Sequence, residues 1–475
     1  MHKLALLQNS GQSRQTRGQS PDTSLALLGM DTVVREGQTE EEGWVGVALD
    51  PTNGVVAATI SEGGALMIWD VTNASRLCVC LPSYFTPDAD TTTATASDPT
   101  TTASDTTPAS EDWPLGAVAW VTPDPAPTPS STSTKRGKKG KRGKNNKKKN
   151  KNNKSSPPPP PPLPTDLVVG VGKGVWRIPH TLNPAGVEAT WNDLTSGKQS
   201  LIHTTPPTWK TPPSLFEDVV SGLAVDRRGD VVVVVDDADR VTLLALANGA
   251  PLSAWTPHPG NMVSSALFSA ARGASSLIAT GGFDCKLLVW DTDGPKSRPV
   301  VGKAITDFSP QEDDDDQGSG AMAFNPPYVM SLGTMGPFVF AALGDGSIAV
   351  TLFKTGALVH RFIGHTARAV CVAPVHVAPS GLKATWDVAL VSASDDNTLR
   401  LFSARISTSP TSPLSPSDHT LATAENDQAL LVIPHPHKIH WMDASLSPLG
   451  TVTIVVGDVG SAIRIYETPL PHDRT

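Results

Sequence analysis

Polar side chains recur at defined spacings in residues 258–291, HPGNMVSSALFSAARGASSLIATGGFDCKLLVWD. Thr280 lies four residues before Asp284, and Trp290 lies six residues after it. A hydroxyl, a carboxylate and an indole N–H can form one hydrogen-bonded chain, with a histidine such as His258 at its outer end. Buried polar groups persist when they are paired in this way, so the spacing predicts a buried structural network.

Three short strands would position these groups. Residues 263–268 alternate apolar and polar, residues 276–281 form an apolar run that ends in glycines, and residues 286–290 lead into Trp-Asp. Residues 283–285 form the tight turn before the last strand. The pattern resembles one WD40 repeat, the four-stranded blade of a β-propeller, which is marked by Gly-His near its start and Trp-Asp at its end.

The unit recurs along the chain. A second copy opens at Gly364-His365, with Ser392 four residues before Asp396 and Phe402 six residues after it, so His365, Ser392 and Asp396 are predicted to form a second network. Five less regular units cover residues 43–70, 116–178, 221–246, 322–353 and 439–466. A β-sandwich also alternates strands and turns, but repeats with shared internal spacings argue against it. We therefore predict an all-β fold, a seven-bladed WD40-type β-propeller with long disordered insertions.

Four segments do not have the composition of a folded core. We expect residues 1–30 to be a disordered tail and residues 31–475 to be a single propeller, with disordered insertions at 84–112, 123–164 and 407–429. Residues 86–112 are acidic, rich in threonine and without a large apolar group, so they cannot bury enough surface to offset chain entropy. Residues 31–35 could supply the outer strand of the last blade and so close the ring, which removes exposed sheet edges.

The charge of the chain is unevenly distributed. Residues 135–154, KRGKKGKRGKNNKKKNKNNK, hold twelve lysines and arginines and no acid. Outside this basic run, 26 basic residues face 46 acidic ones, so the folded body is a poor surface for phosphate backbones. The run fits a nuclear localisation segment, a non-specific nucleic-acid contact or a solvated spacer. Nucleic acid is thus expected only through this run, and the location is expected to be nuclear, cytoplasmic or both.

Several functional classes find little support in the sequence. Four cysteines are too few for a disulfide scaffold, and no apolar stretch is long enough to span a membrane. His435, His437 and His440 have a metal-like spacing, although one of them could simply occupy the Gly-His position. We find no nucleophile elbow, phosphate loop or paired CxxC motif. We therefore predict a non-enzymatic monomer without a cofactor.

The second half of the chain, about residues 215–467, is similar to the family of WD repeat-containing protein 53. The similarity lies in VSSALF (263–268), Phe324-Asn325-Pro326, Gly364-His365 and the ending HPHKIHWM…VVGDVGSAIRIY. It implies a protein-interaction propeller and a substrate receptor of a cullin-4 ubiquitin ligase, bound through the adaptor called damage-specific DNA-binding protein one. Such receptors often present Trp-Asp-x-Arg at the end of a blade, and Arg405 is the one candidate for that arginine here. Arg405 also has a simpler interpretation as a solvated residue near a strand end, and the competing class is a nuclear scaffold in ribonucleoprotein or ribosome assembly.

Overall fold

The computed structural model describes most of the predicted repeats. The described residues are 33–38, 44–49, 56–61, 65–72, 74–80, 115–121, 166–179, 201–202, 207–271, 276–292, 301–308, 325–380, 385–408, 429–460 and 462–470. The predicted tail 1–30, the insertions 84–112 and 123–164 and the basic run 135–154 lie outside them. The predicted insertion 407–429 also lies outside them, except for residues 407, 408 and 429 at its two ends.

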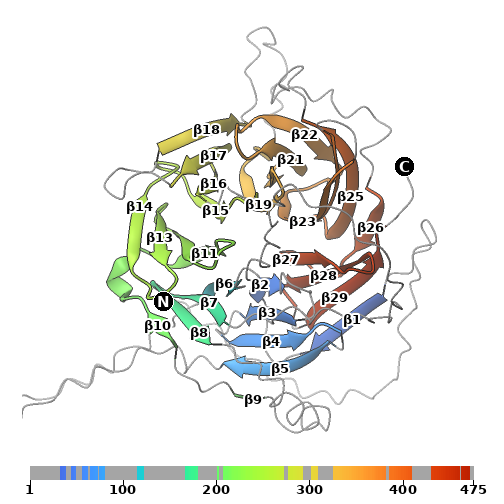
Figure 1. Ribbon diagram of the computed structural model, residues 1–475. Helices are drawn as coiled ribbons and strands as arrows, with labels where there is room; N and C mark the ends of the chain where they lie inside the picture. The colour runs from blue at the N-terminus through green and yellow to red at the C-terminus, as the bar shows by residue number, and fades with distance from the viewer. Residues whose placement is uncertain are drawn as a thin grey trace, which may run out of the picture.

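Seven β-sheets are arranged in a ring around a central axis (Figure 1). The seven-bladed β-propeller predicted from the repeats is thereby confirmed. Within the described residues the only helical segment is a short 3-10 turn, η2 (Pro213–Leu215). Neighbouring strands within each blade are antiparallel and consecutive in sequence, with two exceptions described below.

Each blade begins at the axis and adds strands outward. Blade 1 consists of β2 (Trp44–Leu49), β3 (Val56–Ser61), β4 (Leu66–Asp70) and β5 (Ser75–Cys80). Blade 2 consists of β6 (Leu115–Val121), β7 (Asp166–Val171), β8 (Gly174–Pro179) and β10 (Trp209–Lys210). Blade 3 consists of β11 (Val220–Val225), β12 (Val231–Asp236), β13 (Val241–Ala245) and β14 (Pro251–Trp255).

The remaining blades follow the same order. Blade 4 consists of β15 (Val263–Phe268), β16 (Leu277–Gly282), β17 (Lys286–Asp291) and β18 (Val301–Asp307). Blade 5 consists of β19 (Val329–Met335), β20 (Phe338–Leu343), β21 (Ser347–Leu352) and β22 (Leu358–Ile363). Blade 6 consists of β23 (Ala369–Pro379), β24 (Thr385–Ser394), β25 (Thr398–Ser407) and β26 (Leu431–Pro434). Blade 7 contains β27 (Ile439–Leu446), β28 (Thr451–Asp458) and β29 (Ala462–Pro469).

The first exception is the strand that closes the ring. The outer strand of blade 7 is β1 (Val33–Gln38), which runs antiparallel to β29 with Val33 opposite Glu467 and Gln38 opposite Ala462 (Figure 1). Arg35 also forms an ion pair with Glu467 at 2.8 Å. The prediction that the N-terminal segment completes the last blade is confirmed.

The second exception was not expected from the sequence. A two-residue strand, β9 (Leu201–Ile202), pairs in parallel with β5 and becomes the fifth strand of blade 1. β9 therefore lies at the outer edge of blade 1, although in sequence it falls between two strands of blade 2. Because two residues carry almost no periodicity, sequence pattern could not have indicated this strand.

The core lies between neighbouring blades rather than inside any one of them. The run VVVVVD of β12 is buried on both faces, as expected for a strand whose sheet packs between two others. Between blades 5 and 6, Phe338, Phe340, Phe362 and Phe402 pack in one cluster. Each blade thus depends on both neighbours to bury its faces, as in other repeat proteins.

Candidate functional site

The structure brings the four polar residues predicted in blade 4 together. His258 Nδ1 lies 2.8 Å from Asp284 Oδ1, and His258 Nε2 lies 3.0 Å from Thr280 Oγ1. Trp290 Nε1 donates to Thr280 Oγ1 at 2.9 Å. We expected the histidine at the outer end of the chain, but it lies between the hydroxyl and the carboxylate, because an imidazole can bridge two partners through its two nitrogens.

One arrangement of protons satisfies all these groups. Trp290 donates to Thr280, the Thr280 hydroxyl donates to His258 Nε2, and His258 Nδ1–H donates to Asp284. The network therefore assigns the Nδ1–H tautomer to His258. Gly282, at the end of β16, leaves space for the imidazole of His258. A Cβ added to Gly282 would lie 2.5 Å from His258 Nδ1.

Blade 6 contains the second predicted network in a shorter form. His365 Nε2 lies 2.7 Å from Ser392 Oγ, and His365 Nδ1 lies 3.1 Å from Asp396 Oδ2. Burial lowers the pKa of His365 even though Asp396 acts to raise it. Burial alone would raise the pKa of Asp396, but hydrogen bonds from Thr398 and Thr366 and the nearby His365 hold it below its usual value. Phe402 stands at the position of Trp290 and has no N–H to donate.

Blade 7 contains a third network that sequence reasoning missed. His435 Nε2 lies 2.7 Å from Asp458 Oδ2 and His435 Nδ1 lies 2.7 Å from the Tyr466 hydroxyl, with the His435 and Asp458 side chains fully buried. Asp458 is also paired with Arg464. His435 thus occupies the Gly-His position, which was the simpler interpretation of the histidine cluster. Among the described residues, no group of three or more His, Cys, Asp or Glu side chains is arranged to hold a metal ion.

The register explains why Asp458 was missed. In blade 7 Tyr466 lies opposite Ile454, just as in blade 4 Trp290 lies opposite Ile278. When the two blades are aligned on these pairs, Asp458 is equivalent to Gly282. It therefore comes two residues earlier than the residue equivalent to Asp284, which lies in the turn. A carboxylate can therefore reach the histidine either from the turn or from the end of the preceding strand. A search for the Asp284 spacing finds the first arrangement only.

These networks lie at the end of the propeller where the innermost strands begin. In blades 3 to 7, the carbonyl of the residue just before the innermost strand accepts a hydrogen bond from the turn between the second and third strands. The five bonds, with N···O distances of 2.8–3.3 Å, are Asp237 to Val219, Phe283 to Met262, Gly344 to Tyr328, Asp395 to Arg368 and Val459 to Lys438. We call the five accepting residues, Val219, Met262, Tyr328, Arg368 and Lys438, the rim.

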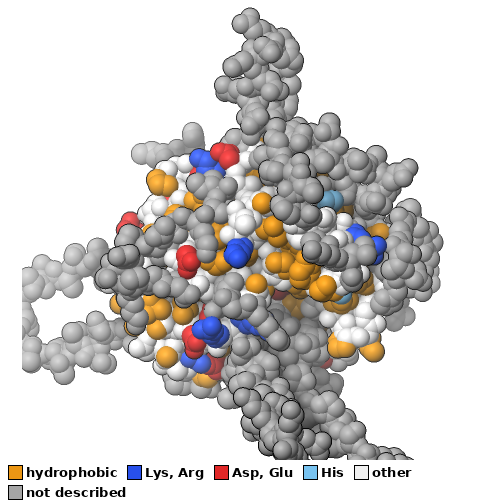
Figure 2. All heavy atoms as spheres, turned by 45° about the horizontal axis from the view of Figure 1, so that its top comes forward, with side chains coloured by type: hydrophobic (Ala, Val, Ile, Leu, Met, Phe, Trp, Pro, Cys, Tyr) orange, Lys and Arg blue, Asp and Glu red, His pale blue; other side chains and the backbone are white. Residues whose placement is uncertain are grey.

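The rim changes character around the ring. Val219, Met262 and Tyr328 form an apolar half, in which Met262 is 47% exposed. Tyr328 also stacks on Phe283 with ring centroids 5.4 Å apart. Figure 2 shows one face of the propeller, on which hydrophobic side chains gather toward the middle with isolated charged side chains among them.

The other half of the rim is basic. Arg368 donates to Asp395 Oδ2 through Nε at 2.8 Å and lies 2.7 Å from the same oxygen through Nη2. Lys438 Nζ lies 3.6 Å from Asp395 Oδ1, beyond hydrogen-bond distance, and its side chain is 48% exposed. Two cations therefore lie beside one carboxylate, which leaves one positive charge in excess among these three side chains.

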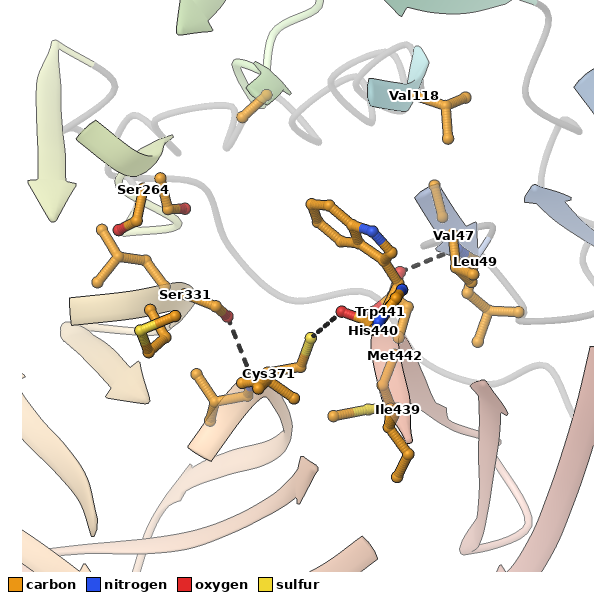
Figure 3. A pocket seen from close by; sticks show the side chains of 18 of the residues that line it. Val47, Leu49, Val118, Ser264, Ser331, Cys371, Ile439, His440, Trp441 and Met442 are labelled. Atoms are coloured by element: carbon orange, nitrogen blue, oxygen red, sulfur yellow. Dashed lines mark hydrogen bonds between the residues drawn. The ribbon is translucent and has the colours of Figure 1, made fainter. Parts of the chain in front are cut away.

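Below the rim lies a channel of about 720 Å³, lined by the innermost strands of all seven blades. Its wall is largely apolar and includes Val47, Leu49 and Val118 (Figure 3). Trp441 of β27 reaches from one side into the middle of the channel (Figure 3), and it is partly exposed. The volume and the apolar wall are typical of a pocket that accepts a small ligand or a side chain.

Two titratable groups of the channel wall are held by the backbone. The Asp443 carboxylate accepts N–H bonds from Leu49 at 2.9 Å and from Ala444 at 2.8 Å, and burial raises its pKa to about 6 against the effect of these bonds. The Cys371 thiol donates to the His440 carbonyl at 3.5 Å, and burial raises its pKa to about 12. Cys371 is therefore a neutral thiol at neutral pH rather than a thiolate nucleophile.

Arg405 lies far from this end of the molecule. The strands β23, β24 and β25 have 10 or 11 residues, and Arg405 belongs to the part of β25 that extends toward the opposite end. Its Nε donates to Asp387 Oδ1 at 2.8 Å, and its side chain is 47% exposed. The structure thus places Arg405 in an exposed ion pair with part of its guanidinium facing solvent.

Comparisons with known proteins agree with the fold. Residues 356–403, from the end of blade 5 into blade 6, match the family model "WD domain, G-beta repeat". A crystal structure of the WD40 β-propeller domain of Doa1 is 13% identical, with a TM-score of 0.49 and coverage of 93% of this chain and 96% of that chain. Raptor from Chaetomium thermophilum is 9% identical, with a TM-score of 0.51 and coverage of 93% of this chain but 28% of that chain. No curated protein sequence is significantly similar.

The fold and the family match define the class of protein. The chain is a seven-bladed β-propeller that carries a WD40 repeat in its second half. Similarity at 9–13% identity concerns the fold alone and says nothing of partners. Within the described residues, no helix is long and apolar enough to cross a membrane.

Proposed function

We propose that this chain is a non-enzymatic scaffold that binds protein partners at the rim and the mouth of the channel. The observation that carries the proposal is the repeated hydrogen bond that fixes each rim residue to the neighbouring turn in five consecutive blades. Side chains held on a rigid backbone can bind a partner with a small loss of conformational entropy. WD40 propellers generally act as protein-interaction scaffolds, which supports the same conclusion.

The chemistry of the channel also favours binding over catalysis. A nucleophile needs a base within hydrogen-bond reach. The Cys371 thiol is instead bound to a backbone carbonyl, and the Asp443 carboxylate is bound to two backbone N–H groups. The Cys371 thiol and the Asp443 carboxylate are thus engaged in backbone contacts within the channel wall.

Affinity purification followed by mass spectrometry tests this scaffold function. We expect Met262→Asp and Lys438→Glu, which change exposed rim residues, to lose the partners that wild type retains. Lys354→Glu is the matched control, because Lys354 is an exposed lysine in a turn at the opposite end of blade 5. Equal sets of partners for wild type and both rim variants would contradict binding at the rim.

We propose, as a more specific role, that the chain serves as a substrate receptor of a cullin-4 type ubiquitin ligase, as its resemblance to the WD repeat-containing protein 53 family implies. Arg405 would supply the adaptor contact, and its exposed guanidinium supports this, because a planar charged donor can bind an acceptor of the partner. Arg405→Ala should weaken co-purification of the adaptor and change stability by no more than about 0.5 kcal/mol. Arg240→Ala is the control, since Arg240 also forms an exposed ion pair, with Glu217. Adaptor capture that is equal for both variants would exclude Arg405 as the contact.

A second candidate is a nuclear scaffold for ribonucleoprotein or ribosome assembly. It is favoured by the basic run 135–154 on an otherwise acidic chain. Deletion of this run should abolish nuclear accumulation and any RNA binding, and that binding should weaken steeply with salt. RNA binding that survives the deletion would contradict this candidate.

A further inference from the structure

We propose that the rim and the channel take an extended peptide segment in which acidic residues flank a large apolar side chain. This inference rests on the proposed scaffold function and specifies the chemical class of partner. It follows from the unequal halves of the rim and from the indole that lies below them.

The basic half would hold the acidic residues. Lys438 Nζ lies 3.6 Å from the nearest Asp395 oxygen, so its ammonium donors are not committed to that carboxylate by hydrogen bonds. Arg368 already binds Asp395 through two nitrogens, which fixes the guanidinium beside Lys438. A carboxylate of a partner placed beside Lys438 would balance the excess positive charge without displacing Asp395. Charge complementarity of this kind selects the partner and its register.

The apolar half and the channel would hold the large side chain. Met262 is 47% exposed, and Phe283 and Tyr328 present a stacked pair beside it. Trp441 offers an indole that is 36% exposed inside a channel of about 720 Å³. Tryptophan and methionine are enriched where proteins bind one another. Tryptophan buries a large area at a small loss of conformational entropy, and the flexible methionine side chain adapts to the shape of the partner.

The same geometry disfavours a basic peptide. In the described channel wall such a peptide would meet two carboxylates, Asp395 and Asp443; Arg368 binds Asp395 through two nitrogens, and Asp443 accepts two backbone N–H bonds. Nucleic acid is disfavoured too, since a phosphate backbone binds through many cations, and Arg368 and Lys438 are the only lysine or arginine side chains in the part of the channel wall that the structure describes.

The test is a selection from a displayed library of random twelve-residue peptides on the immobilised full-length chain. The library is first depleted on the double variant Lys438→Glu/Trp441→Ala of the full-length chain. That variant keeps the basic run 135–154, so peptides that bind the run by charge alone are removed. We expect the peptides that remain to be enriched in Asp and Glu beside Leu, Phe, Trp or Met.

An enriched peptide is then synthesised with a fluorescent label and titrated by anisotropy. Lys438→Glu should weaken its binding about tenfold, and Trp441→Ala more strongly, about thirtyfold, because buried aromatic anchors dominate such interfaces. Lys354→Glu makes the same charge change at the opposite end and should leave binding unchanged. Thermal unfolding midpoints that match wild type would show that the variants are folded.

The outcomes separate this inference from the function on which it rests. Enrichment of basic peptides, or no enrichment over the double variant, would overturn the acidic-apolar class. If the rim variants nevertheless lose protein partners in affinity purification, the scaffold function stands and only the class of partner is wrong. If they lose none, the scaffold function at the rim fails as well.

Discussion

Asp284→Ala should destabilise the propeller by about 2–4 kcal/mol, although the residue lies in a short turn near the surface. His258 is fully buried, and its Nδ1–H has Asp284 Oδ1 as acceptor at 2.8 Å. Removing the carboxylate leaves this donor unpaired, which costs about 1–3 kcal/mol, and the lost hydrogen bond to a charged group adds to that cost. The backbone N–H of Lys286, 3.2 Å from the same oxygen, loses an acceptor as well.

Equilibrium unfolding in urea, followed by tryptophan fluorescence and circular dichroism, measures this loss. For a urea dependence of about 3 kcal/mol per M, a loss of about 3 kcal/mol lowers the midpoint by about 1 M. Asp284→Asn is the matched control, because its amide oxygen can still accept from His258 while the charge is removed. We expect Asp284→Asn to recover more than half of the lost stability.

Two results would refute this reasoning. An Asp284→Ala protein within about 0.5 kcal/mol of wild type would mean that the network adds little to stability, as is usual for surface substitutions. Equal losses in Asp284→Ala and Asp284→Asn would mean that the charge of Asp284, and not its acceptor oxygen, is what the fold needs.

Two further predictions concern pH and ring closure. Because burial raises the pKa of Asp443 to about 6, the folded state holds this proton more tightly than the unfolded state, so stability should fall as pH rises from about 4 to 6. Asp443→Asn should remove this pH dependence of stability. The difference in unfolding free energy, variant minus wild type, should therefore rise by about 2–3 kcal/mol between pH 4 and 7. A difference that stays constant with pH would contradict a raised pKa for Asp443. Deletion of residues 1–38 should lower the melting temperature and cause self-association seen by light scattering, because it exposes the edge of β29, whereas deletion of residues 1–32 should do neither. Identical behaviour of the two truncations would show that β1 is dispensable.

The fold was predictable because its signal is repeated. Seven units with similar spacing predicted seven blades, and a spare outer strand at the N-terminal end of the repeats predicted the closing strand. β1 begins at Val33 in the described residues, close to the predicted 31–35. Local pattern was sufficient here because each blade is a meander of successive strands; among the described strands, β1 and β9 alone pair outside this succession.

The site was predictable only in part. The spacing that identified Asp284 and Asp396 could not find Asp458, because that carboxylate comes from a strand end. The rim could not be predicted either, because its five residues share no type and are related only by their position before the innermost strands. Such equivalence becomes visible when the strands have been paired, since register and not residue identity defines it.

The closing strand has a consequence for the order in which the protein is synthesised. Arg35 and its partner Glu467 are 432 residues apart, so a ribosome adding about 5–20 residues per second makes the second about 20–90 s after the first. During that interval β1 has no partner, and it must remain unpaired while six blades emerge behind it. Its two valines are followed by Arg35 and Glu36, and such charged side chains discourage a strand edge from joining the wrong sheet during this interval. Two strands that are synthesised far apart in time thus meet in one blade, and the propeller can become a closed ring only when translation has passed β29.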